Sequence, residues 1–136
     1  MPPAKNIPRG IRNNNPLNIR IGNVWLGERE HPTDLWFEEF VTMAYGLRAA
    51  FVILRRYIRH YHIDTVAGIV HRWSPDGGEK EKYYIDTVCQ RTQLTPDQPI
   101  KYEDRETMVN LVAAMAFVEC GQNIAREQIE RGYTIA

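Results

Sequence analysis

One stretch near the N-terminus, residues 9–20, limits the possible folds of this chain more than any other. It reads Arg-Gly-Ile-Arg-Asn-Asn-Asn-Pro-Leu-Asn-Ile-Arg, and we call it the asparagine segment. Its content of Asn, Gly and Pro is too high for a helix, and Pro16 pushes the residue before it towards an extended conformation. Asparagine side chains bond readily to nearby backbone and tolerate left-handed geometry, so we expect a rigid, self-bonded loop. Such a loop either caps the domain or presents fixed amides to a saccharide.

From Tyr45 onwards the apolar residues recur at intervals of three and four, which indicates helices. The first and longest is predicted from Ala44 to His60, with Leu47, Phe51 and Leu54 on its buried face. Capping residues, prolines and glycines bound the others. These further helices are expected over Thr65 to Trp73, Glu79 to about Gln90, Arg105 to Cys120 and Asn123 to Arg131.

The residues between the asparagine segment and the first long helix have a β pattern. Gly22-Asn23 is a hairpin signal, so we predict a small β-hairpin of Leu17 to Ile21 against Val24 to Gly27. The aromatic segment 36–41 is a possible third strand. At 136 residues the chain suits one domain. The predicted fold is mainly α (α+β), with a flexible arm at 1–8 and a single domain at 9–136.

Composition argues against several classes of function. Basic and acidic residues balance at 17 each, so no global field attracts nucleic acid or an anionic membrane. The one concentrated basic patch is typical of a solvated helix face. It comprises Arg48, Arg55, Arg56, Arg59 and His60. No stretch approaches the roughly 18 apolar residues of a membrane span, and no signal peptide is evident. We expect no membrane insertion, and DNA association is the least favoured alternative.

Several motifs together resemble a family of small phage and prophage proteins. The shared pattern is the asparagine segment, then Trp25-Leu-Gly27, Phe37 and Phe40, Gly46-Leu-Arg-Ala49, Arg72-Trp-Ser-Pro75, Tyr84 and a late helix ending in a Glu. This RGIRNNNPxNIR family comprises virion structural proteins and lysozyme-like muralytic proteins. The resemblance covers most of the chain. It implies a lysozyme-like domain, with peptidoglycan or other virion proteins as partners.

A weaker similarity joins the chain to autolysin-type β-N-acetylglucosaminidases of the lysozyme-like superfamily. In these enzymes a catalytic glutamate at a helix end precedes an NLFGIK segment and a WxG motif. Here Asn15 to Arg20 and Trp25-Leu-Gly27 resemble the later part, and Ala113 to Gly121 resembles the glutamate helix. Because the order is reversed, the similarity implies a circular permutation of one fold.

Glu119 is the strongest candidate for catalysis. It follows the apolar run Met115-Ala-Phe-Val118, where burial should raise the pKa of its carboxyl group and retain a proton. A general acid acting on a glycosidic oxygen needs this property. The alternative is an exposed residue in the last turn of a helix.

A glycosidase commonly needs a second carboxylate, and Asp34 is our choice over Glu28, Glu38 and Glu39. Enzymes resembling lytic transglycosylases need only one glutamate, so the sequence leaves hydrolysis and transglycosylation open. The resemblance to autolysin-type enzymes also makes Tyr84 a candidate catalytic side chain. The predicted substrate-binding residues are amides, a cation and aromatic rings that could frame a saccharide: Asn13, Asn14, Asn15, Asn18, Arg20, Trp25 and Trp73.

Metal and cofactor chemistry have no motif support. The spacing His60-x-His62 fits a strand but occurs at a predicted helix end, and neither CxxC nor HExxH is present. Cys89 and Cys120 are expected to be free thiols. We therefore expect no metal and no cofactor. The favoured hypothesis is a muralytic enzyme made in the host cytoplasm without a signal peptide and acting at the cell wall or within the virion. A virion structural protein without the chemistry is the first alternative.

Overall fold

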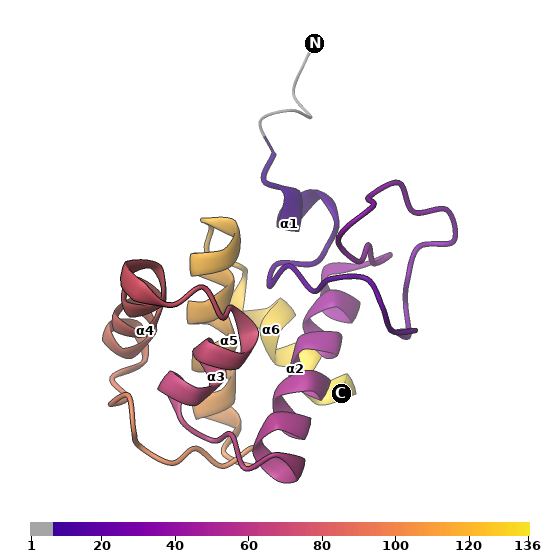
Figure 1. Cartoon of the computed structure of the whole chain (residues 1–136). Helices are drawn as coiled ribbons and strands as arrows, with labels where there is room; N and C mark the ends of the chain where they lie inside the picture. Colours follow the sequence, from indigo (N-terminus) through magenta and orange to yellow (C-terminus); the bar gives the residue numbers. More distant parts are fainter. Residues whose placement is uncertain (1–6) are drawn as a thin grey trace.

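The computed structural model describes residues 7–136, and six helices lie within this range (Figure 1). The predicted arm at 1–8 falls mostly on residues 1–6, outside the described residues. The helices are α1 (Arg9–Arg12), α2 (Met43–His60), α3 (Val66–Trp73), α4 (Gly78–Thr92), α5 (Arg105–Cys120) and α6 (Arg126–Ile135). The prediction of a mainly helical fold is confirmed. Four of the five predicted helices match with boundaries within a few residues.

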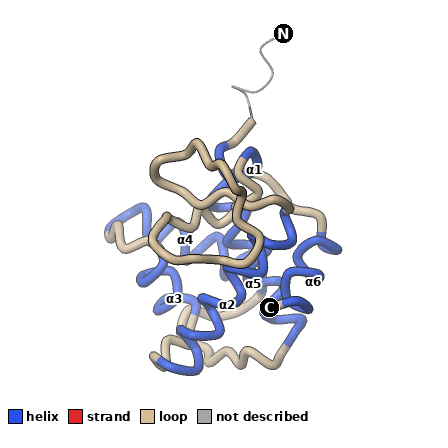
Figure 2. Tube along the Cα trace, turned by 90° about the vertical axis from the view of Figure 1, so that its right-hand side faces the viewer, coloured by secondary structure: helices blue, strands red, loops and turns tan. Residues whose placement is uncertain are grey.

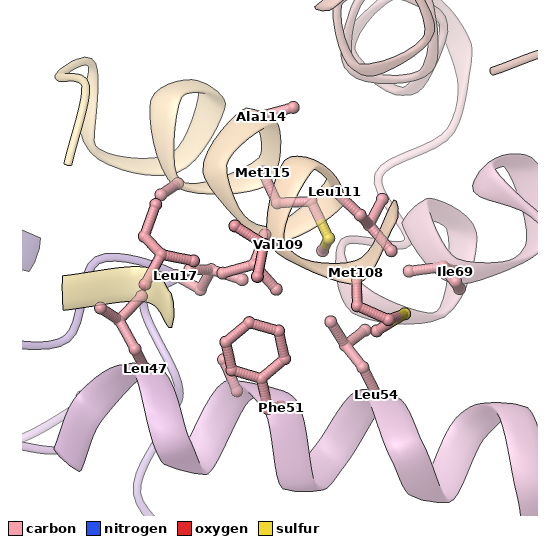
Figure 3. Close-up of a cluster of buried hydrophobic side chains, with 14 of the residues drawn as sticks. Leu17, Leu47, Phe51, Leu54, Ile69, Met108, Val109, Leu111, Ala114 and Met115 are labelled. Carbon is pink, nitrogen blue, oxygen red and sulfur yellow. The ribbon is translucent and has the colours of Figure 1, made fainter. Parts of the chain in front are cut away.

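Helices α2 and α5 enclose the centre of the hydrophobic core. Leu47, Phe51 and Leu54 of α2 face Met108 and Met115 of α5, as Figure 3 shows. The Thr42 hydroxyl accepts a hydrogen bond from the Tyr45 N–H at the start of α2, and Asp104 caps α5 in the same manner. Both helices were predicted because their apolar residues recur at helical spacing. The core is continuous from the asparagine segment to α6.

Helix α6 begins and ends later than predicted. We expected a helix from Asn123 to Arg131 that Gly132 would terminate, but the helix runs through Gly132 to Ile135. At this glycine a Cβ would lie 2.6 Å from Leu47 Cβ, so the missing side chain permits α6 to pack closely on α2. The Tyr133 hydroxyl then donates a hydrogen bond of 2.8 Å to the Tyr102 carbonyl. Tertiary packing therefore outweighs the weak helix propensity of glycine here.

The prediction that the asparagine segment contains no helix is wrong for its first four residues. Arg9–Arg12 form the single turn α1, which begins after Pro8, and the Pro8 carbonyl accepts from the Ile11 and Arg12 N–H groups. The asparagines begin only after this turn, and Gly10 lies against α5. A Cβ on Gly10 would lie 3.1 Å from Cys120 Cβ. The turn therefore packs against the end of α5.

The predicted hairpin of Leu17 to Ile21 against Val24 to Gly27 is not found among residues 7–136. Two isolated antiparallel bridges occur instead, Arg20 with Phe37 and Glu28 with Phe40. Residues 19–21 therefore pair with residues 36–38 of the predicted third strand. The physical reason is burial: Phe40, which forms the bridge with Glu28, is fully buried, whereas Val24 is 94% exposed and would bring no apolar face to a hairpin. Figure 2 shows this region as loops above the helices.

A close backbone contact joins the asparagine segment to α2. A Cβ on Gly46 would overlap the carbonyl oxygen of Asn14, so only glycine permits this approach. On the far side of the segment, the Asn14 side chain donates a hydrogen bond to the Phe40 carbonyl. The asparagine segment is thus held between α2 and residues 36–40, with its later residues directed towards the end of α5.

Candidate functional site

Glu119 lies in the last turn of α5, and the asparagine segment contacts it directly. The Asn18 side-chain amide donates hydrogen bonds to the Glu119 carbonyl, at 3.1 Å, and to its Oε1, at 3.3 Å. The first bond satisfies one of the carbonyls left without an intrahelical partner at a helix C-terminus. Asn18 has a positive φ of 53°, which asparagine tolerates better than most residues. Two residues that are 101 positions apart in the chain therefore meet at one point.

Two adjoining cavities meet at Glu119. The Trp73 cavity, of about 340 Å³, is lined by Asn18, Ile19, Arg20, Phe37, Ile53, Tyr57, Trp73, Ser74, Pro75, Asp76 and Glu119. The Tyr83 cavity, of about 460 Å³, is lined by Ser74, Asp76, Glu79, Lys80, Tyr83, Tyr84, Val118 and Glu119. Ser74, Asp76 and Glu119 belong to both linings. The two cavities thus adjoin at these three residues, with the Glu119 carboxyl group at the junction, and we refer to the pair as the depression.

The environment of Glu119 favours its protonated form. Burial is the largest effect and raises the pKa of this carboxyl group, and the negative charge of Asp76 raises it further. Contacts with Tyr84 and Asn18 and the charge of Arg20 act in the opposite direction but do not outweigh burial. Loss of hydration penalises a carboxylate more than a neutral acid. Glu119 therefore has the property expected of a proton donor.

Tyr84 projects from α4 into the neighbourhood of Glu119. Its side chain is buried, and burial together with the negative charge of Glu119 raises the pKa of the phenol. The hydroxyl makes no hydrogen bond within the described chain, although it is close enough for each group to affect the pKa of the other. We therefore treat Tyr84 as a neutral neighbour of the carboxyl group.

The other predicted substrate-binding asparagines are engaged away from the two cavities. Asn15 is fully buried, and its amide donates to the Ile19 and Glu38 carbonyls while its oxygen accepts from the Ile19 N–H. Asn13 donates to Asp34, and Asn14 binds the Phe40 carbonyl. These three side chains shape the loop. Asn18 is the member of the set that reaches the candidate site.

Arg20 and Trp73, two of the predicted substrate-binding residues, line the Trp73 cavity. The Trp73 indole donates a hydrogen bond of 3.1 Å to the Leu17 carbonyl, which fixes the ring beside the asparagine segment. The guanidinium of Arg20 lies 5.3 Å from the centre of the Phe37 ring. Trp25 packs against the core and lines neither cavity.

Asp34, our predicted second carboxylate, lies apart from Glu119 in another cavity of about 290 Å³. Burial of the Asp34 carboxyl group raises its pKa, but hydrogen bonds from Asn13, Arg9 and the backbone N–H groups of Trp36 and Phe37 outweigh that effect and lower it overall. The Arg9 contact is 2.7 Å. These bonds hold the loop together, so the geometry indicates a structural role for Asp34 in this loop.

The remaining acids on this side of the molecule also lie outside the two cavities. Glu39 binds Arg29 and the N–H groups of Thr33 and Asp34. Glu38 is 7% exposed, and its Oε2 has no hydrogen-bond partner within residues 7–136. Burial and the adjacent Glu28 carboxyl raise the pKa of Glu38 to about 7.

Sequence reasoning missed Asp76. It lies in the loop between α3 and α4 and contributes to both cavities. The prediction sought a second carboxylate near the expected hairpin, whereas the carboxylate that lines both cavities with Glu119 lies in the loop between α3 and α4. The sequence Pro75-Asp-Gly-Gly78 marks a loop after a helix that carries Trp73, but no local pattern connects that loop with Glu119.

The alternative chemistries gain no structural support. The part of the chain that the structure describes brings together no group of three or more His, Cys, Asp or Glu side chains suited to a metal ion. Burial raises the pKa of both thiols, Cys89 and Cys120, which disfavours a thiolate nucleophile. None of the helices within residues 7–136 is both long and apolar enough to cross a membrane.

The basic patch on α2 is largely occupied by contacts within the protein. Arg55 and Arg59 stack over the Tyr102 ring, and Arg59 also pairs with Glu103 at 2.9 Å. Arg48 donates to the Ile135 carbonyl. A cationic side chain with an internal partner is less available to a phosphate, so this face supports the DNA-associated alternative poorly.

Comparison with known proteins gives one informative similarity. No protein-family model matches the chain. The chain is 37% identical over 130 residues to "Protein P5" of Pseudoalteromonas phage PM2. The aligned region covers 92% of this chain and 79% of that protein.

Proposed function

This chain belongs to the family of protein P5 of Pseudoalteromonas phage PM2, and we propose that it is a phage muralytic protein that binds peptidoglycan and cleaves its glycan strand. One observation carries the proposal: a half-buried carboxyl group at the junction of two adjoining cavities. A depression with a proton donor near its middle suits a chain-like substrate that must be cut internally.

Glu119 is the general acid in this proposal. Burial keeps its carboxyl group protonated to a higher pH than usual, so it can give a proton to the glycosidic oxygen as the bond to the anomeric carbon breaks. Asn18 orients the carboxyl group through Oε1. Tyr84 provides an apolar wall with a neutral hydroxyl next to the acid.

The Trp73 cavity offers groups that suit a sugar ring. Trp73 and Phe37 supply aromatic surface, and Arg20 supplies a cation for a carboxylate carried by the wall polymer. Apolar faces with a few fixed polar groups are typical of ligand sites. In this proposal the protein is made in the host cytoplasm and acts on the wall. The proposal also includes a lysozyme-like fold whose motifs occur in a circularly permuted order. The contact between Asn18 and Glu119 supports it, because it joins the asparagine segment to the helix that ends in the glutamate.

A clearing assay with purified cell walls tests the proposal. The protein should reduce the turbidity of the walls, and Glu119→Gln should lower the rate by about 100-fold or more, because the amide has no acidic proton to transfer while Oε1 can still accept from Asn18. Glu106→Gln is the matched control, since Glu106 is exposed at the other end of α5. Equal clearing by the wild type and Glu119→Gln would remove Glu119 from the mechanism.

A second candidate is a virion structural protein without catalysis, and one observation favours it. The loops between α1 and α2 expose large apolar side chains, which commonly mark a protein contact. These are Ile21, Val24, Leu26, Leu35, Trp36 and Val41. Absence of clearing by the wild-type protein would favour this candidate over the enzyme.

A further inference from the structure

Asp76 and Glu119 line the same two cavities, although they come from different parts of the fold. Asp76 belongs to the loop that joins α3 to α4, where Gly77 and Gly78 take positive φ values of 69° and 59°. The Ser74 hydroxyl donates a hydrogen bond of 2.9 Å to Asp76 Oδ2, and the Asp76 N–H donates one of 2.8 Å to the Ser74 carbonyl. The loop thus holds this carboxylate in place. No hydrogen bond to its Oδ1 occurs within the described residues.

The two carboxyl groups have opposite surroundings. Glu119 is half-buried and shielded from water, whereas Asp76 is exposed at the mouth of both cavities. The negative charge of Asp76 raises the pKa of Glu119, in the same direction as burial. Paired carboxyl groups in contrasting environments commonly divide the work of acid and base.

The other acids within reach fit this role less well. Asp34 and Glu39 are held by cations and backbone N–H groups away from the depression. Glu79 lines the Tyr83 cavity but not the Trp73 cavity. Asp76 is the carboxylate that shares both linings with Glu119.

We propose that Asp76 is the second catalytic carboxylate of this site and that it activates water for hydrolysis of the glycan. The inference rests on the proposed function. Asp76 takes a proton from the water as the water oxygen bonds to the anomeric carbon. The bond to the glycosidic oxygen breaks at the same time, and Glu119 gives its proton to that oxygen. The products are two free hydroxyl ends, and solvent returns a proton to Glu119 and removes one from Asp76.

This role selects hydrolysis over transglycosylation. Transglycosylation uses the substrate's own hydroxyl as the attacking group and adds no water, so its products are lighter by one water molecule. A base that activates water also implies inversion at the anomeric carbon, because acid and base act on opposite faces of the ring. Product mass and initial anomeric configuration therefore report on Asp76.

The experiment compares the wild type, Asp76→Asn and the control Glu106→Gln on purified, uncrosslinked glycan strands; Glu106 is exposed and lines neither cavity. We expect a loss of about 100-fold or more for Asp76→Asn and a rate near wild type for Glu106→Gln. Wild-type products, separated by chromatography and weighed by mass spectrometry, should carry the added water. Sodium azide should restore cleavage by Asp76→Asn and give a glycosyl azide, because azide attacks without a base. Circular dichroism checks that each variant is folded.

The outcomes separate the inference from the proposed function. If the wild type fails to cleave, the proposed function falls and the role of Asp76 falls with it. If the wild type cleaves and Asp76→Asn cleaves equally well, only the role of Asp76 is overturned. Products that lack the added water would overturn it too, as would a folded, inactive Asp76→Asn that azide does not rescue.

Discussion

Asn15 and Asn18 lie close in sequence but bind different partners. The Asn15 amide is buried and bonded entirely to backbone groups, so it replaces the hydrogen bonds that a strand would supply. The Asn18 amide donates a hydrogen bond to Glu119, which lies 101 positions later in the sequence. At the scale of the residue, the same chemistry stabilises a loop in one case and orients a candidate acid in the other. What differs is the position of each residue relative to α5.

A residue-scale prediction concerns Glu38, whose pKa of about 7 lies above its ordinary value of 4.5. A raised pKa means that the folded state binds the proton more tightly than the unfolded state. Its contribution to stability is therefore complete below about pH 4.5 and is lost as the pH rises through about 7. Gln resembles the protonated acid, so Glu38→Gln should raise the Tm at about pH 8, by on the order of 5 °C, and change it little at about pH 5.

Thermal unfolding followed by circular dichroism at the two pH values measures this effect. Glu28→Gln should act in the same direction, because it removes the neighbouring acid that helps to raise the Glu38 pKa. Glu106→Gln serves as the control and should give the same small change at both pH values. A Tm of Glu38→Gln below that of the wild type at about pH 8 would contradict the prediction.

At the scale of the element, α2 organises the N-terminal half of the protein. Its buried face forms one side of the core, and its first turn receives the backbone of Asn14 at Gly46. Two separate sequence motifs, the asparagine segment and Gly46-Leu-Arg-Ala49, are thus the two sides of one contact. Helix α5 has a comparable role, because it carries Glu119 at the end that α1 and Asn18 approach (Figure 1).

Gly46→Ala tests that contact. The added methyl group would overlap the Asn14 carbonyl, so the asparagine segment must move, and we expect a loss of about 1–3 kcal/mol in the free energy of unfolding. Chemical denaturation measures the loss. Gly68→Ala in α3 is a matched control, since the nearest atoms to its Cβ are the side-chain atoms of Ile63 and Thr65 at 3.2 Å. Similar effects of the two variants would mean that the backbone contact at Gly46 is unimportant.

At the scale of the whole molecule, the candidate site exists only where three segments meet. Asn18 and Arg20 come from the asparagine segment, Asp76 from the loop between α3 and α4, and Glu119 from the end of α5. The asparagine segment and α5 contribute to one continuous core, and the helices on either side of the loop with Asp76 pack on that core through Trp73 and Tyr84. We therefore infer that residues 9–136 behave as one domain, with no part of the site stable alone.

Cooperative unfolding is the corresponding prediction. Tryptophan fluorescence reports on the N-terminal region through Trp25 and Trp36 and on the Trp73 cavity through Trp73, whereas far-ultraviolet circular dichroism reports on the helices. If the chain is one domain, the two midpoints should coincide within about 2 °C. A fluorescence transition at clearly lower temperature than the loss of helix would show that the N-terminal region unfolds separately.

Helix positions, the residues of the core and the candidacy of Glu119 could be derived from the sequence, because periodicity, caps and an apolar run act over a few residues. Gly132 shows where such local rules end: its helix continues because α6 packs on Leu47. Only the tertiary structure shows that Asn18, and not Asn13, Asn14 or Asn15, contacts Glu119. It also shows that Asp76, and not Asp34, lines a cavity with Glu119. These arrangements depend on which distant segments pack side by side, and long-range packing has no signature in the residues next to each group.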